Sequence, residues 1–446
     1  MKVQKISEIH SQFSLFPAQD FELFKSRFHQ SDLGKIYNAI PWDEMVQVFD
    51  IKEKQEGRKF LFPAQGRLAL MFLKNYSGLS DKKLIEHLNG NIEWQFFCGI
   101  YLGFNRINNY KIVSQIRGEL ASKLNIEKTE KALYDYWKPH ILETKKVLID
   151  ATCYESEMRY PTDVKLLWES VEWCHQRMVK ICQFLSIPRV RTKYLKWMKC
   201  YVNYSKMRRK TKTKKNALRR ASLLLINKLM NFLEQHEHFL NSSELKKMQT
   251  IKEVYDQQYA WFYKEENPKN RIVSLHKEYV RPIVRGKEIN KVEFGPKVNK
   301  IQIDGISFIE HLSFDAFHEG IRFKDSIYKT ESLTGTKTKI AGADAIFATN
   351  ENRRFATKEG IETDFKPKGP KAKNHKQRKE LRTQISKERA SRLEGSFGKD
   401  KECYHLRKIK AKTEQNEILW IFFGIHVGNA LEIGRRKTAA LVKKAA

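Results

Sequence analysis

The sequence predicts an α/β protein: a core with a mixed sheet and flanking helices, a long helical insert in that core, and an all-helical N-terminal region. Helical spacing of apolar residues runs through residues 1–140, and strand patterns follow at 145–153 and 290–365. A helical pattern separates the two groups of strands in the sequence, but both groups are expected to share one sheet. The predicted domains are 1–140, a core of 141–165 and 271–446, and an insert of 166–270.

The charge balance indicates a polyanionic partner. The chain of 446 residues holds 84 Lys and Arg against 52 Asp and Glu, which gives a net charge of +32. A field of this sign attracts polyanions, and nucleic acid is the commonest large one. A membrane surface or a ribosome is an alternative that charge alone leaves open. At 41% hydrophobic, the chain still has enough apolar residues to bury a sizeable core.

Cysteine usage and the apolar runs favour a protein of the reducing cytosol. The six cysteines form no C-x-x-C pair, which argues against both a zinc ribbon and a disulfide framework. The start, MKVQKISEIHSQF, lacks the apolar segment of a signal peptide. The longest apolar run, ILWIFFGI at 418–425, is much shorter than the roughly 20 residues of a membrane span, so we expect it in a buried helix.

Residues 62–100 predict two amphipathic helices joined by a short turn. Apolar residues recur at helical spacing on both sides of Gly78, and Ser80 is placed to cap the second helix. Such a pair fits a DNA-binding helix-turn-helix. It fits an ordinary helical bundle at least as well, and both interpretations stay open.

Residues 164–265 read as two or three long antiparallel helices with heptad-like apolar stripes. Between Pro188 and Lys228 there are 15 Lys or Arg and no acidic residue, with aromatic residues interleaved. A solvated basic face is the alternative, but the missing counter-charges favour contact with a phosphate backbone. Four cations are predicted to share one helical face and bind DNA: Arg208, Lys212, Lys215 and Arg219.

Three carboxylates stand where metal-dependent phosphate chemistry needs them. Asp150 ends the predicted strand KKVLID, Asp344 follows the strand TKIAGA, and Glu394 lies on a later helix. A carboxylate at a strand end projects above the sheet, where ligands bind. Such a cluster repels itself unless cations sit in it, and Mg²⁺ prefers carboxylate oxygens. Because acidic residues are numerous, Asp304 and Asp315 remain competing candidates.

The chain resembles bacterial insertion-sequence transposases of the DDE type, in the group with a YPTD-containing first block and a helical N-terminal domain. The resemblance runs over nearly the whole chain in the same order, which is more specific than any single motif. It rests on the helical stretch 62–100, with its GLSDKKLIEHL, and on five further blocks: DATCYESEMRYPTDVKLL (150–167), HKEYVRPIVRGKEINKVEFGPKVN (276–299), DGISFIEHLSFDAFHEG (304–320), AGADAIFATNENRRFATKEGI (341–361) and RLEGSFGKDKECYHLRKIKAK (392–412).

The resemblance implies an RNase H-like catalytic core with Asp150, Asp344 and Glu394 as its triad. These residues would hold Mg²⁺ or Mn²⁺, as two ions. The Glu block also supplies three DNA-binding candidates: Arg392, Lys399 and Lys401.

The sequence departs from the family pattern at two positions. Position 390, four residues before Glu394, is Ala where the family has a basic residue, and Ala345 replaces the usual basic residue or Gly after the second Asp. Lys401 keeps the basic residue seven positions after Glu394, a spacing that puts both on one helix face.

The implied activity is DNA transposition: cleavage at the ends of the element, then attack of the released 3′-hydroxyl on target DNA. No G-x-x-x-x-G-K-[ST] loop occurs, so ATP use is not implied. The implied partners are terminal inverted repeats and target DNA, bound by a homodimer at the nucleoid of the bacterial cytoplasm, with no membrane. Two rivals stay open: a catalytically inactive nucleic-acid-binding protein derived from a transposase, and a metal-dependent nuclease with the same triad.

Overall fold

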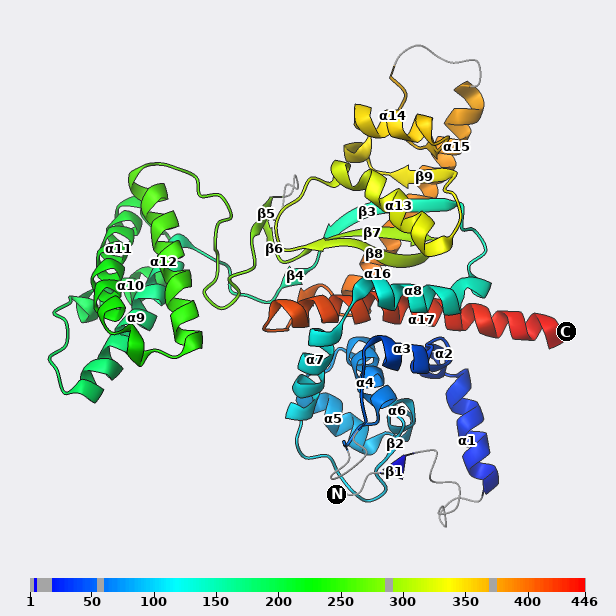
Figure 1. Cartoon of the computed structure of the whole chain (residues 1–446), viewed down its shortest axis with the longest axis horizontal. Coiled ribbons are helices and arrows are strands. Elements are labelled where there is room, and N and C mark those ends of the chain that lie inside the picture. Colours follow the sequence, from blue (N-terminus) through cyan, green and yellow to red (C-terminus); the bar gives the residue numbers. More distant parts are fainter. Residues whose placement is uncertain (1–3, 6–17, 54–59, 285–291, 369–374, 446) are drawn as a thin grey trace. The chain divides into compact units, whose positions relative to one another are not determined.

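The computed structural model describes residues 4–5, 18–53, 60–284, 292–368 and 375–445. The chain forms two compact units, each described here by itself (Figure 1). The core unit comprises Met1–Ser156, Pro296–Ser313 and Phe317–Ala446, and the insert unit comprises Glu157–Gly295 and Phe314–Ala316.

The core unit contains a five-stranded mixed sheet (Figure 1), in the order β10-β9-β3-β7-β8. β3 pairs in parallel with β9, which pairs in parallel with β10, whereas β7 is antiparallel to both of its neighbours. The bounds are Lys146–Cys153 for β3, Lys297–Ile303 for β7, Ile306–Ser313 for β8, Ile340–Ala343 for β9 and Glu362–Thr363 for β10. The predicted mixed sheet, built from strands on both sides of the insert, is confirmed.

The strand predicted at 145–153 is confirmed as β3. The prediction that Asp150 ends this strand is wrong, because β3 continues to Cys153 through its pairing with β7. β6 (Val292–Phe294), expected in the shared sheet, pairs instead with β5 (Pro282–Val284) inside the insert unit. A short strand can be recognised from its pattern, but the pattern does not say which partner it pairs with. Residues 285–291 of the same sequence block lie outside the described part of the chain.

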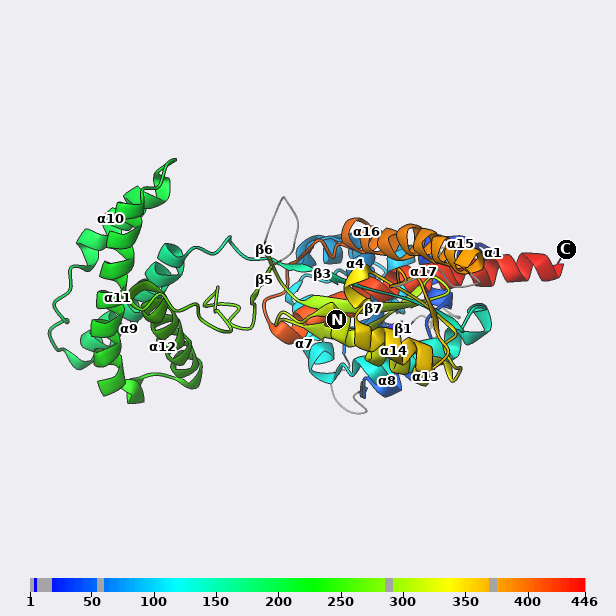
Figure 2. The same ribbon diagram turned by 90° about the horizontal axis from the view of Figure 1, so that it is seen from above.

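The two faces of the sheet are covered by different segments. Alternation along β3 turns Val147 and Ile149 into the large apolar core and turns Leu148 to the other face, where it packs on Leu393. Figure 2 shows α15 and α16 on one side of the strands and α13 and α14 on the other. The bounds are α13 Phe323–Thr334, α14 Asn350–Lys358, α15 His375–Glu388, a π-helical turn Arg389–Glu394 and α16 Gly395–Glu402.

The N-terminal region is helical, as predicted, apart from a two-residue ladder between β1 (Gln4–Lys5) and β2 (Ile100–Tyr101). The predicted helix pair is α4 and α5: Gly78 ends α4 at φ +63°, and the Ser80 hydroxyl accepts the Lys83 N–H at 3.3 Å. The helices are α1 Ala18–Gln30, α2 Asp32–Asn38, α3 Trp42–Val48, α4 Ala64–Ser77, α5 Asp81–Gly90, α6 Ile92–Phe97, α7 Lys111–Lys123 and α8 Ile126–Trp137.

The apolar run at 418–425 lies in the long C-terminal helix α17 (Glu414–Ala445), which packs against α2, α4 and α7. Its side chains from Leu419 to Phe423 are buried, or nearly so, as predicted. Among the described residues, no helix has both the length and the apolar character that a membrane span requires.

The insert unit holds four long helices where the sequence predicted two or three. They are α9 Asp163–Leu185, α10 Tyr194–Lys206, α11 Lys212–Gln235 and α12 Ser242–Tyr263. The predicted apolar stripes of α9 and α11 pack against each other in one buried cluster. Thr211 caps α11 by accepting the Lys214 N–H at 3.4 Å, so Arg208 lies in the connection before that helix. The prediction that Arg208 shares a helical face with Lys212 is therefore wrong.

Candidate active site

Asp150 and Asp344 meet on neighbouring parallel strands of the core unit. The register pairs Ile149 of β3 with Ala343 of β9, so Asp150 and Asp344 each follow the last residue pair of the β3–β9 ladder, although β3 itself continues to Cys153. Residues at matching positions of paired strands project to the same side of a sheet. The charge of Asp344 accordingly acts on Asp150 and raises its pKa. The structure thus brings together two of the three carboxylates that the sequence singled out.

The surroundings of the Asp150 carboxyl raise its pKa. Burial raises its pKa to about 6, and the charges of Glu319 and Asp344 act in the same direction. The Ala151 N–H, which donates to Asp150 Oδ1 at 2.8 Å, and the charge of Arg389 lower the pKa and offset part of this effect. A half-buried acid beside other acids is stabilised in its charged form when a cation joins it.

Arg389 connects Asp344 with a second buried acid, Asp364. Its guanidinium lies 3.5 Å from Asp344 Oδ1 and 3.2 Å from Asp364 Oδ2. Asp364 is buried, accepts the Ala343 N–H at 3.0 Å, and has a pKa raised by burial. Asp344 is 56% exposed and accepts the Ala345 N–H at 2.7 Å, which fixes its carboxylate at the start of a short turn.

Glu394 lies on the helical segment that covers the Asp150 face of β3. Three contacts tie this segment to β3 in sequence order: Lys146 with Glu388 at 2.8 Å, Leu148 with Leu393, and Thr152 with Lys401 at 3.1 Å. Asp150 stands between the second and third contacts on the strand, and Glu394 stands between them on the helix. Glu394 is exposed and shares a helix face with Lys401, seven residues later.

Among the described residues, no group of three or more His, Cys, Asp or Glu side chains is arranged to hold a metal ion. Glu394 therefore does not complete such a group with Asp150 and Asp344. The donors present still fit a hard divalent cation, because the pKa of Asp150 is raised by burial and by the neighbouring carboxylates of Glu319 and Asp344.

A buried polar cluster holds α16 against the strands. Lys300, paired with Asp150 across β3 and β7, is fully buried, and its Nζ donates to Asp400 Oδ2 at 2.6 Å and to Ser396 Oγ at 3.2 Å. The Tyr154 hydroxyl donates to the same Asp400 oxygen at 2.6 Å, and burial together with Asp400 raises the pKa of Tyr154. Removing any member would leave a buried polar partner unsatisfied.

A basic cavity of about 590 Å³ lies beside Lys401 within the core unit. Its two carboxylates are already engaged: Asp81 pairs with Lys74 at 2.8 Å and with Arg117 at 2.7 Å, and Glu402 pairs with Arg407. The remaining charge of the wall is positive, which suits a phosphate group. The cations that line the cavity are Lys74, Lys82, Arg117, Lys401, Arg407, Lys408 and Lys410.

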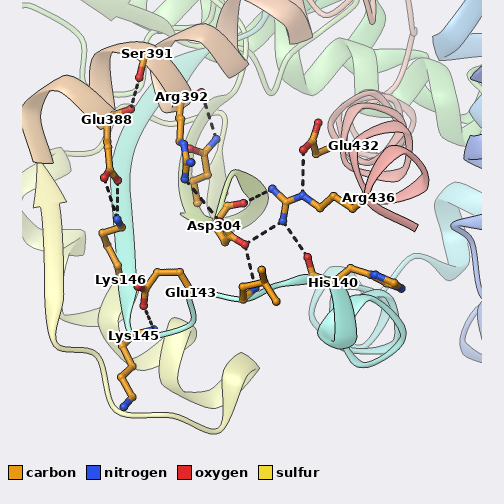
Figure 3. Close-up of polar contacts among 12 residues, drawn as sticks. His140, Glu143, Lys145, Lys146, Asp304, Glu388, Ser391, Arg392, Glu432 and Arg436 are labelled. Atoms are coloured by element: carbon orange, nitrogen blue, oxygen red, sulfur yellow. Dashed lines mark hydrogen bonds and ion pairs between the residues drawn. The ribbon is translucent and has the colours of Figure 1, made fainter. Parts of the chain in front are cut away.

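The competing candidate Asp304 is occupied by structural contacts (Figure 3). It begins the tight Asp304-Gly305 turn between β7 and β8, with φ +48° and +83°, which suits a two-residue hairpin. Arg436 donates to its Oδ2 at 3.0 Å, and Arg392 lies 3.7 Å from its Oδ1. Asp315 belongs to the insert unit, where Arg281 lies 3.8 Å from it.

Two of the four cations predicted to bind DNA from the insert are engaged inside that unit. Arg219 is buried, and its guanidinium lies over the Phe262 ring at 4.7 Å, which leaves it out of reach of a phosphate backbone. Lys215 lies 3.2 Å from Asp163. Arg208 and Lys212 are exposed, as are Lys399 and Arg392 of the core unit.

Sequence reasoning missed five residues of this region: Lys300, Glu319, Asp364, Arg389 and Asp400. One of them could have been found, because Asp364 follows the short strand β10 just as Asp344 follows β9. Lys300 and Asp400 are 100 residues apart, and neither lies in a pattern that predicts a buried pair. Glu319 lies in a 3-10 turn, and its charge acts on Asp150 because the fold brings the two residues near each other, not because of any local sequence pattern.

Two family models match parts of the chain. Residues 21–119 match a family described as a transposase domain (DUF772), and residues 342–426 match a family described as a transposase DDE domain. The first match includes the α4–α5 pair, and the second includes Asp344, Glu394 and Lys401. No curated protein and no solved structure matches the chain.

Proposed function

Because the chain carries transposase domains in its N-terminal and C-terminal parts, the latter a DDE domain, we propose that it is the DNA transposase of a bacterial insertion sequence. It would bind the ends of the element, cleave the DNA there and join the freed 3′ ends to target DNA. The observation that carries the catalytic part is the meeting of Asp150 and Asp344 at the end of the parallel β3–β9 ladder, where burial raises the pKa of Asp150 to about 6.

The proposed core is RNase H-like, and its triad is Asp150, Asp344 and Glu394, which would hold two Mg²⁺ or Mn²⁺ ions. When bound, such ions polarise a phosphodiester and lower the pKa of an attacking water. The raised pKa of Asp150, caused first by burial and then by the charges of Glu319 and Asp344, supports a site that gains from cations. Arg389 would keep the Asp344 carboxylate oriented through its bridge to Asp364.

The proposed DNA path near this site follows the positive charge. Lys401 donates to Thr152, two residues beyond Asp150, and also lines the basic cavity of the core unit. It would therefore contact phosphate close to the scissile bond, with Arg392 and Lys399 on the same helical segment. Binding as a homodimer on paired ends, in the bacterial cytoplasm and without ATP, completes the proposal.

Incubation of the purified protein with duplexes that carry the DNA flanking its gene tests this function. We expect Mg²⁺- or Mn²⁺-dependent products with 3′-hydroxyl ends, and joined products when target DNA is added. Asp344→Asn is expected to remove both products and to retain DNA binding, because no basic side chain is lost. Cleavage without joining would make the protein a nuclease instead. Binding without cleavage in either metal would make it an inactive transposase derivative.

A further inference from the structure

A cleft of about 690 Å³ in the insert unit is lined by four cations, here called the rim, and by apolar side chains, here called the floor. Arg191 and Lys193 come from the segment before α10, and Arg220 and Lys228 come from α11. Trp197, Leu224 and Leu225 belong to the floor. This is a different set of cations from the four that the sequence alone suggested, and it lies in the same basic stretch.

The four rim cations have no competing acid. All four are exposed, and among the described residues none of them takes part in an ion pair within 4.0 Å. None of the described residues that line the cleft is Asp or Glu. Unpaired like charges on one rim repel one another, and a polyanion relieves that repulsion. Lys215 and Arg219, by contrast, are already engaged by Asp163 and by aromatic rings.

The floor distinguishes this cleft from a plain basic surface. Arg220, Leu224 and Lys228 follow one another at four-residue spacing, so an exposed apolar side chain stands between two cations on one face of α11. Leu224 is 65% exposed, so its apolar surface is open to a ligand in the cleft. Trp197 is half-buried and offers an indole beside it.

We propose that this cleft binds an unpaired stretch of nucleic acid, with phosphates on the four rim cations and a base against Trp197 and Leu224. A duplex keeps its bases stacked inside and would touch only the rim, whereas an unpaired strand offers both its charge and its apolar base faces. The inference deepens the proposed function and rests on it for the identity of the polyanion as DNA.

Two matched sets of substitutions test the rim. The cleft variant carries Arg191→Gln, Lys193→Gln, Arg220→Gln and Lys228→Gln. The control variant removes four exposed cations of the same unit outside the cleft, with Arg208→Gln, Arg209→Gln, Lys210→Gln and Lys212→Gln. Binding of the full-length protein to a fluorescent 15-nucleotide oligo(dT) is measured by anisotropy across a salt series in EDTA, and binding to a 15-base-pair duplex is measured alongside.

For the cleft variant, the log–log salt slope on oligo(dT) is expected to become shallower by up to about 0.7 per lost contact, or about 2.8 for four contacts. The control variant is expected to change the slope by less than one contact on the same probe. Equal slopes for the two variants would overturn the proposal, since the cleft would then be one part of a diffuse positive surface.

A single substitution tests the floor without altering the rim. Leu224→Glu places a carboxylate in the cleft, and Leu195→Glu is its control, because Leu195 is 67% exposed and lies outside the cleft. We expect Leu224→Glu to weaken oligo(dT) binding at least 10-fold more than duplex binding, and Leu195→Glu to weaken both equally little. Equal weakening of both probes by Leu224→Glu would contradict the unpaired strand. Both tests measure binding only. They can therefore refute the cleft proposal while the proposed DNA cleavage still stands.

Discussion

At the scale of single residues, Asp150 is the member of the proposed triad whose acidity is clearly perturbed. Its carboxyl is half-buried, faces two other acids, and has a pKa raised to about 6. The ionised carboxylate therefore destabilises the folded protein when no cation is bound beside it. The same arrangement favours metal binding, because a bound cation stabilises the ionised carboxylate. Asp150 therefore destabilises the metal-free protein and stabilises the metal-bound one.

Asp150→Asn should stabilise the metal-free protein at alkaline pH. The pKa is about 6 when folded against an ordinary 3.8, so wild-type stability falls as pH rises from about 4 through 6 and then stays low. The variant lacks this loss and should be more stable above pH 7 by at most about 3 kcal/mol, with no difference near pH 4. Urea unfolding in EDTA at several pH values measures it, and a variant less stable than wild type at pH 8 would contradict the pKa.

How much of the site was visible in the sequence differs from residue to residue. Asp150 and Asp344 follow apolar strands, and the structure does bring them together. Arg219 was predicted to face DNA because helical spacing says which residues share a face, not which face is buried. The aromatic rings that cover Arg219 come from α12, more than 40 residues away, and a local pattern carries no information about them.

At the scale of elements, Glu394, the third predicted acid, is positioned by one helical segment. This segment consists of α15, the π-helical turn and α16. The turn covers Arg389–Glu394, and π-helical turns of this kind are frequent at functional sites. Arg389, the first residue of the π-helical turn, forms an ion pair with Asp344, and Glu394 is the last residue of the turn. The sequence predicted a helix here but gave no sign of the extra residue per turn, which changes the faces of the residues on either side.

The buried pair of Lys300 and Asp400 should hold α16 in place. Lys300→Met or Asp400→Leu alone leaves an unpaired buried charge and is expected to lower the free energy of unfolding by about 3–5 kcal/mol. The double variant removes both charges and should recover most of that loss. A double-mutant cycle by urea unfolding measures the coupling. Additive single effects would show that the two side chains do not interact in solution.

At the scale of the whole molecule, the insert unit consists almost wholly of one continuous segment. The chain leaves the core unit after Ser156 and returns at Pro296, and only Phe314–Ala316 join the insert unit from further along the chain. The Tyr154 N–H donates to the Pro296 carbonyl at 3.1 Å. The two ends of the insert are therefore neighbours in an antiparallel ladder. Sequence periodicity predicted a helical insert between strands of one sheet, but it did not show that β5 and β6 fold with the insert.

Replacing residues 157–295 with a short Gly/Ser linker should leave the core unit folded. The deletion joins two adjacent strands by a hairpin and removes no strand of the five-stranded sheet. Circular dichroism and a cooperative thermal transition measure the fold of the shortened chain. Its DNA affinity should depend less steeply on salt than that of the full chain, because 15 Lys and Arg between Pro188 and Lys228 are lost. A chain without a cooperative transition would show that the core depends on its insert.

The measurement that tests the catalytic assignment most directly is the rate of Mg²⁺-dependent cleavage by Glu394→Gln, with Glu380→Gln as its matched control. Both acids are exposed on the helical segment that runs from α15 to α16, and Glu380 does not line the basic cavity, so the two variants lose the same charge. We predict that Glu394→Gln slows cleavage roughly 100-fold or more at unchanged DNA affinity, as expected when a metal ligand is lost. Glu380→Gln should cleave at the wild-type rate. Cleavage by Glu394→Gln at the wild-type rate would contradict the triad of Asp150, Asp344 and Glu394.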